Sequence, residues 1–171
     1  MKKFTQEEFD RFEINEKGYR ICPSGDYSLI KDFGECCSFG EWSSFGECCS
    51  FGEGCSFGEW SSFGKRCSFG ERSSFGKSCS FGEGCSFGEG CKIENDHTLL
   101  DFVKFEGFGS EKRCTYFFLT EQGIYVRCGC FSGSLETFLD KVKKTHGDSR
   151  HGREYRMLAE LAMSHFEGEK E

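Results

Sequence analysis

The stretch FGECCSFGEWSSFGECCS, residues 33–50, begins a six-residue repeat that continues to Cys91. Each unit reads Phe-Gly-Glu/Lys-x-Cys/Ser-Ser, and the phenylalanines never leave this register. Such a period fits neither a heptad nor an α-helical turn, and a glycine in a helix interior costs about 1 kcal/mol. We therefore predict short strands around a ladder of core rings: Phe39, Phe45, Phe51, Phe57, Phe63, Phe69, Phe75 and Phe81.

Side chains two apart in a strand share a face, so Cys37 and Phe39 are predicted to point inward and Ser38 outward. Glycine and Glu/Lys then fall at or near the corners. Most of the 13 cysteines occupy the inward position, where serine often replaces them, as in Ser43 and Ser61. A disulfide partner does not tolerate this exchange, whereas a small packed side chain does. We interpret the cysteines as free thiols in a reducing compartment.

The repeat resembles the hexapeptide repeat of left-handed β-helix proteins, in which an aliphatic residue stands where this chain has phenylalanine. The resemblance covers residues 27–98 and implies a left-handed triangular β-helix of about four coils, with three hexads in each coil. Glu41-Trp42 recurs 18 residues later as Glu59-Trp60, which agrees with that coil length and would stack the two tryptophans. The bulk of the phenylalanines leaves a four-sided right-handed β-helix as the alternative. Disordered Phe-Gly segments differ in having variable spacers.

Residues 1–26 are predicted to form an N-terminal cap of the repeat array. Thr5 and Glu8 have the spacing of a capping box, and Phe4 and Phe9 occupy the two hydrophobic-staple positions. A short helix is expected there, followed by a strand at residues 19–22.

Residues 99–171 are predicted to form a separate α+β module of order β-β-β-α-α, which makes the whole chain mainly β with an α+β tail. A hairpin turning at Gln122-Gly123 would place Phe117 and Val126 on one face. Ser134 is expected to cap the first helix and Gly147 to end it. A hexad array with this tail also resembles uncharacterised proteins of bacteria and phages, which implies no activity.

The sequence favours a protein without catalytic residues, metal or cofactor. Acyltransferases that share the hexapeptide repeat use a histidine, usually near an interruption of the coils. Here the hexads contain neither histidine nor insertion, and His97 follows them. The thiols of Cys128-Gly129-Cys130 and of adjacent pairs such as Cys36-Cys37 lack the paired spacing of a zinc site.

Two surfaces are predicted to contact a macromolecular partner, in the first place a protein. One consists of Trp42 and Trp60, which occupy the variable hexad position. The other combines sheet side chains with a basic run and suggests nucleic acid as a further partner. Its residues are Tyr116, Phe118, Tyr125, Arg127, Lys143, Lys144, Arg150 and Arg153.

The leading hypothesis is a non-enzymatic scaffold: a rigid β-helix with a C-terminal macromolecule-binding module. The glutamates of the hexads suggest an alternative, an acidic DNA mimic that inhibits a DNA-binding protein, and a degenerate acyltransferase relative is the third hypothesis. The net charge of -7 argues against general affinity for nucleic acid or membranes. The N-terminus lacks a signal-peptide pattern and no apolar run approaches the ~20 residues of a membrane span, so a cytoplasmic location is expected.

Overall fold

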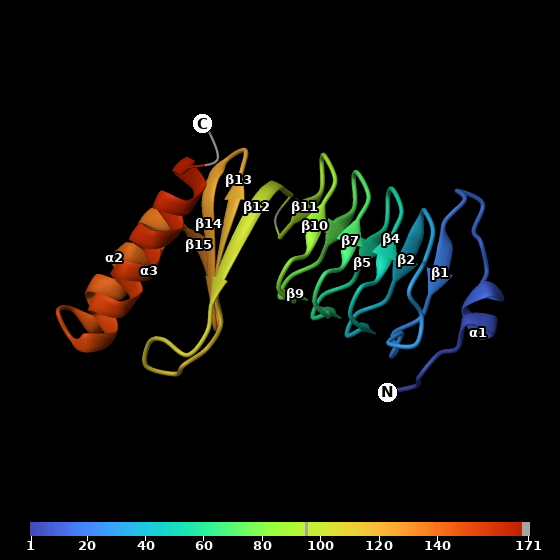
Figure 1. The fold of residues 1–171 in the computed structure, drawn as a ribbon, viewed down its shortest axis with the longest axis horizontal. Coiled ribbons are helices and arrows are strands. Elements are labelled where there is room, and N and C mark those ends of the chain that lie inside the picture. Colours follow the sequence, from blue (N-terminus) through green and yellow to red (C-terminus); the bar gives the residue numbers. More distant parts are fainter. Residues whose placement is uncertain (95, 169–171) are drawn as a thin grey trace. The chain divides into compact units, whose positions relative to one another are not determined.

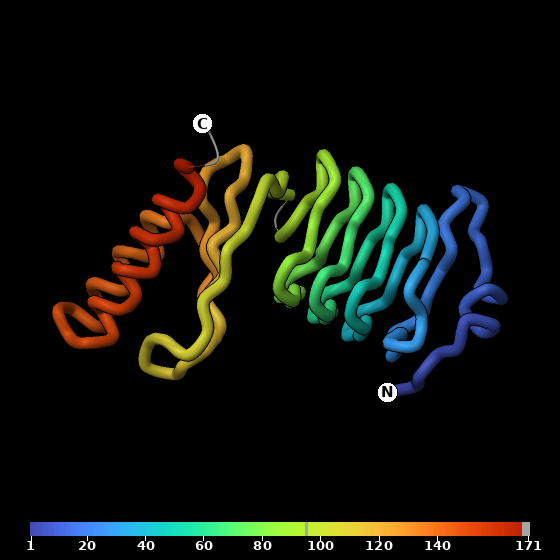
Figure 2. Tube along the Cα trace, viewed as in Figure 1, coloured from blue at the N-terminus to red at the C-terminus, as the bar shows by residue number. Residues whose placement is uncertain are grey.

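The computed structural model describes residues 1–94 and 96–168. The chain divides into two compact units, Met1–Thr98 and Leu99–Glu171. The first unit is a β-solenoid of about four stacked coils, and Figure 2 shows successive coils following the same path. The prediction of a repeat β-helix is thereby confirmed at the level of a β-solenoid.

Three parallel sheets form the solenoid, because each coil contributes one short strand to each sheet (Figure 1). Paired residues such as Ser38 and Ser56 are 18 positions apart, which is the coil length expected from three hexads. Within the solenoid, the first sheet contains β1 (Arg20–Cys22), β2 (Cys37–Phe39), β5 (Ser56–Phe57), β8 (Ser74–Phe75) and β11 (Lys92–Ile93). The second contains β3 (Ser44–Phe45), β6 (Ser62–Phe63) and β9 (Ser80–Phe81), and the third β4 (Ser50–Phe51), β7 (Ser68–Phe69) and β10 (Ser86–Phe87).

Phenylalanine rings fill the solenoid in columns. Along a column the rings stack with parallel planes, as Phe39 does on Phe57 with centroids 5.2 Å apart. Between columns they meet edge to face, as Phe57 and Phe63 do at 4.8 Å and 89°. The edge-to-face geometry suits the quadrupole of the ring. All the predicted ladder positions are buried: Phe39, Phe45, Phe51, Phe57, Phe63, Phe69, Phe75 and Phe81.

From Gly40 to Gly88, the glycine that follows each hexad phenylalanine lies against the backbone of the preceding coil. A Cβ on Gly64 would be 2.6 Å from the backbone nitrogen of Glu47, and the same close approach recurs at Gly82. Any side chain there would push two coils apart. The invariant glycine is therefore explained by contact between coils.

The N-terminal segment continues the aromatic columns. Its helix α1 (Gln6–Asp10) begins with the predicted capping box, which is confirmed by the hydrogen bonds between Thr5 and Glu8. Phe4 stacks on Tyr27 at 5.0 Å, and the edge of Phe9 meets Phe33 at 5.3 Å. The first coil thus has its aromatic core covered by further rings.

The second unit is an antiparallel sheet with helices on one side (Figure 1). Its helices bury Phe117, Val126, Phe138, Leu158 and other apolar side chains between themselves and the sheet. The elements are β12 (His97–Phe105, whose first two residues belong to the first unit), β13 (Thr115–Thr120), β14 (Gly123–Cys128), β15 (Phe131–Ser134), α2 (Leu135–His146) and α3 (Arg150–Glu167).

Two sequence predictions for this unit were wrong in detail. A fourth strand, β15, follows the hairpin, so the order is β-β-β-β-α-α. The first hairpin turns at Glu121-Gln122, because Thr120 pairs with Gly123. The helix boundaries at Ser134 and Gly147 are confirmed, and the Ser134 side chain accepts a hydrogen bond from the backbone of Thr137.

Candidate functional site

The first candidate site is a pair of tryptophans on the solenoid surface, here called the tryptophan ladder (Trp42 and Trp60). Their rings stack with centroids 5.2 Å apart and planes 6° from parallel, which confirms the stacking predicted from the sequence. They are 57% and 50% exposed. Their backbone N–H groups donate to the carbonyls of Glu59 and Lys77 in the following coil, at 2.9 and 2.8 Å. The rings are therefore mounted on hydrogen-bonded turns.

The ladder occupies a backbone conformation that is unfavourable for tryptophan. Trp42 has φ 60° and Trp60 has φ 61°, both in the left-handed region. For residues other than glycine this region costs roughly 1–2 kcal/mol. The same hexad position holds glycine in other coils, for example Gly54 and Gly84. The two tryptophans therefore place a bulky, half-exposed ring at a backbone position that glycine would occupy without strain.

The charged corners of the solenoid are only partly neutralised. Lys65 forms an ion pair with Glu83, 18 positions further on, at 3.2 Å, and Arg72 pairs with Glu53. The 18-residue register brings four glutamates of one corner into a row that contains no lysine or arginine at that hexad position: Glu35, Glu53, Glu71 and Glu89.

The inward thiols of the solenoid pack against backbone carbonyls. The thiol of Cys55 donates to the carbonyl of Gly34 at 3.5 Å, and that of Cys91 to Gly70 at 3.3 Å. Ser61 donates in the same way to the carbonyl of Gly58, in its own hexad. Cysteine and serine are both small, and both donate a hydrogen bond to a glycine carbonyl here. This explains why serine replaces cysteine at the inward hexad position.

Neighbouring thiols and burial keep several of these cysteines protonated. The contact with Cys22, together with burial, raises the pKa of Cys37 to about 12. Burial raises the pKa of Cys91 as well. A protonated thiol is a poor metal ligand and a poor nucleophile. Within residues 1–94 and 96–168, no three His, Cys, Asp or Glu side chains gather in a way that would hold a metal.

The predicted aromatic face of the C-terminal sheet forms an internal cluster. The Arg127 guanidinium lies over the ring of Tyr116 at 4.5 Å and over that of Phe118 at 5.4 Å, in cation–π contact. Tyr125 pairs with Phe118 across the strands. All four side chains are buried.

The basic run lies on the helices and is not joined to this cluster. The helices cover the sheet face that contains Phe117, whereas Tyr116 and Arg127 alternate onto the opposite face. The predicted basic residues Lys143, Lys144, Arg150 and Arg153 are exposed. Arg150 pairs with Glu154 at 2.8 Å, and Arg153 donates to the carbonyl of Asp148 at 2.6 Å. The aromatic and basic residues thus lie on opposite sides of the sheet, and their contact with nucleic acid stays a prediction.

A second candidate site is a cavity of about 180 Å³ in the C-terminal unit, here called the helix-end pocket. Its lining comes from the loop that precedes β13, the β14–β15 turn and the two helices. Phe131, Phe138 and Val142 supply apolar walls. The remaining lining residues are Ser110, Glu111, Arg113, Cys128, Gly129, Cys130, Lys141, Thr145, His146 and Tyr155.

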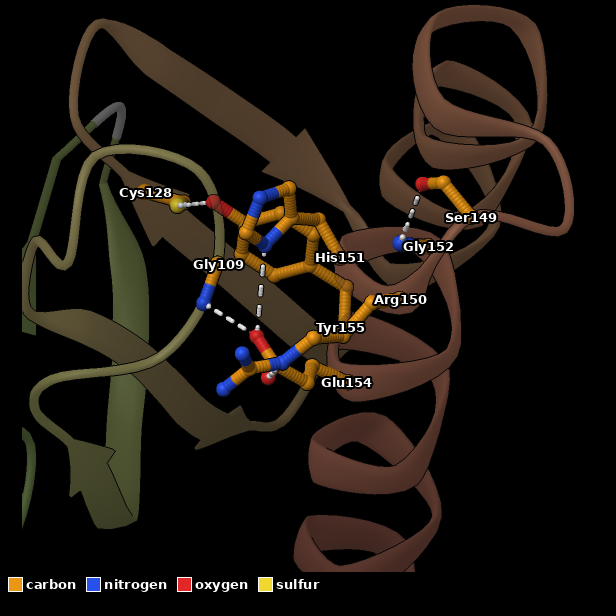
Figure 3. Close-up of polar contacts among 8 residues, drawn as sticks. All are labelled: Gly109, Cys128, Ser149, Arg150, His151, Gly152, Glu154 and Tyr155. Carbon is orange, nitrogen blue, oxygen red and sulfur yellow. Dashed lines mark hydrogen bonds and ion pairs between the residues drawn. The ribbon is translucent and has the colours of Figure 1, made fainter.

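Glu154 fastens the loop of the helix-end pocket to α3 (Figure 3). Its carboxylate accepts hydrogen bonds from the backbone N–H of Gly109 at 2.9 Å and from Arg150 at 2.8 Å, and it lies 3.5 Å from His151. The Gly109 N–H, followed by Arg150, lowers the pKa of this carboxyl. Beside it, Tyr155 approaches Gly109 so closely that a Cβ there would overlap the phenol.

Sequence reasoning did not find the helix-end pocket. The sequence indicated Cys128-Gly129-Cys130 only as thiols without the spacing of a zinc site. The turn around Gly129 was the one sequence feature that pointed to this pocket. Nothing in the sequence shows that Arg113 and α2 lie beside this turn.

Comparison with the known protein families, with curated proteins and with solved structures gave no match. Among residues 1–94 and 96–168, no helix is both long and apolar enough to cross a membrane.

Proposed function

We propose that this protein is a non-enzymatic interaction scaffold: a left-handed, triangular β-helix that presents the tryptophan ladder to a protein partner. Three sheets and an 18-residue coil support a three-sided path over a four-sided one, and the hexapeptide resemblance supports the left hand. The C-terminal α+β unit serves as a second binding module. The observation that carries the proposal is the tryptophan ladder.

Two physical costs converge on Trp42 and Trp60. Each side chain strains a left-handed backbone position, and each leaves half of a large apolar ring in water. Strain of this kind concentrates at functional sites, and tryptophan is enriched among the residues that dominate binding energy at protein interfaces. Burial of the ladder by a partner would recover the exposed apolar area. The rigid solenoid would hold both rings in place without an ordering cost.

The test is affinity capture with purified full-length protein, followed by quantitative mass spectrometry. Trp42→Gly/Trp60→Gly removes both rings and relieves the backbone strain, so the fold is kept. Arg66→Gly/Arg72→Gly is the matched control, since both arginines occupy the same hexad position with φ 56° and 57°. We expect the tryptophan variant to lose a partner that the arginine variant keeps. Equal recovery by both variants would contradict the proposal.

The glutamate row supports a second candidate, an acidic DNA mimic. Glu35, Glu53, Glu71 and Glu89 recur at the spacing of parallel strands, about 4.8 Å. Arg72 neutralises Glu53, which weakens the row as an imitation of a phosphate backbone. Competition with duplex DNA for the captured partner separates the two functions: a mimic is displaced by DNA, whereas a ladder-bound partner is not.

A further inference from the structure

The helix-end pocket combines an apolar interior with positive charge, and it involves none of the ladder residues. A cavity of about 150 Å³ lined by apolar side chains takes up benzene. The helix-end pocket, at about 180 Å³, therefore has room for one six-membered ring with a small substituent. Phe131, Phe138 and Val142 provide the apolar contact for such a ring.

Two cationic side chains line the same pocket. Arg113 runs across the β14–β15 turn: a Cβ on Gly129 would be 2.8 Å from its Nη1 atom, so the glycine makes room for the arginine. Lys141 is exposed, and no ion pair involves it among the residues that the structure describes. The local positive charge stands out in a chain whose net charge is -7.

The charges also select the kind of anion. A guanidinium offers parallel N–H donors that match a carboxylate. Glu111 lies 3.8 Å from Arg113 and disfavours a doubly charged group such as a phosphate monoester. The pocket therefore favours a single negative charge beside a flat apolar body.

We propose that the helix-end pocket binds a small aromatic monocarboxylate, with its ring between Phe131, Phe138 and Val142 and its carboxylate at Arg113 and Lys141. Benzoate is the simplest probe of this chemistry. Benzamide has the same shape without the charge, and acetate has the charge without the ring.

The first experiment is titration of the full-length protein with benzoate, benzamide and acetate, followed by protein NMR. Benzoate should shift signals of the pocket residues and bind more tightly than both comparators. Arg113→Gln and Lys141→Gln should each weaken benzoate binding about two- to fivefold, the range for exposed ion pairs. Lys144→Gln is the matched control, because Lys144 lies on the same helix and does not line the pocket.

A second measurement does not depend on any variant. Cys130 lines the pocket and is exposed, while Cys48 is an exposed thiol of the solenoid. Benzoate should slow the alkylation of Cys130 by iodoacetamide and leave that of Cys48 unchanged, as read from modified peptides. Benzamide binding as tightly as benzoate, or alkylation of Cys130 at an unchanged rate under saturating benzoate, would overturn the proposal.

Discussion

Replacing Phe63 with leucine tests whether the aromatic columns stabilise the solenoid beyond ordinary hydrophobic burial. Six rings surround Phe63 with centroids 4.8–5.8 Å away, two of them stacked and four edge to face. An aromatic pair contributes about 0.5–1.5 kcal/mol beyond its buried area, so six pairs at the low end come to about 3 kcal/mol. The poorer fit of leucine adds about 1 kcal/mol. We expect Phe63→Leu to lower the free energy of unfolding by about 4 kcal/mol.

Phe117 is the matched control in the C-terminal unit. It is also buried, but among the described residues only two rings contact it, those of Phe105 and Phe138 with centroids at 5.9 and 5.8 Å. The same reasoning gives a loss of about 2 kcal/mol for Phe117→Leu. The comparison isolates the number of ring pairs, since both changes replace a buried phenylalanine with leucine.

Urea unfolding can follow each unit separately. Both tryptophans of the chain, Trp42 and Trp60, lie in the solenoid, so their fluorescence reports its unfolding. Far-ultraviolet circular dichroism is dominated by α2 and α3 and reports the C-terminal unit. If Phe63→Leu destabilises the solenoid no more than Phe117→Leu destabilises the other unit, the account of the aromatic columns is wrong.

Two further predictions concern the glycine contacts and the pocket loop. Gly64→Ala should cost at least about 2 kcal/mol in urea unfolding, because its Cβ would overlap the backbone of Glu47. Gly54→Ala should cost only about 1 kcal/mol: its Cβ would lie 3.6 Å from the sulfur of Cys36, an ordinary contact, and only the left-handed backbone at φ 68° is strained. Equal costs would refute the contact argument. The lowered pKa of Glu154 means that its stabilisation is complete above the ordinary carboxyl pKa of about 4.3 and is lost as the pH falls through the lowered folded-state value. Glu154→Gln should therefore reduce the melting temperature near neutral pH and flatten its decline in acid; parallel curves for variant and wild type would contradict this role.

The periodic part of the fold could be predicted because its contacts are encoded at fixed spacing. The stacking of Trp42 on Trp60 and the pairing of Lys65 with Glu83 both follow from one coil length. The left-handed backbone at the variable hexad position could not be read from the sequence, because residues as different as Trp60 and Ser78 occupy it. The conformation is imposed there by the hydrogen bonds between coils.

The C-terminal unit was predictable in its elements and less so in its surfaces. Alternation correctly separated Phe117 from Tyr116, since side chains in a strand alternate between faces. Which face the helices would cover was not encoded in this alternation, because both faces carry aromatic residues. The aromatic and basic residues consequently lie on opposite sides of the sheet, and their role in binding stays a prediction.

The sequence by itself determined the solenoid, its coil length, its aromatic interior and the helix ends at Ser134 and Gly147. These properties depend on residues that are close in the chain or separated by one fixed period. Only the tertiary structure decided that Gly64 touches the coil before it and that Arg127 is buried over Tyr116. It also decided that Arg113 and Lys141 line the same cavity. Such contacts join positions of no regular spacing, so they depend on how the sheet and helices pack.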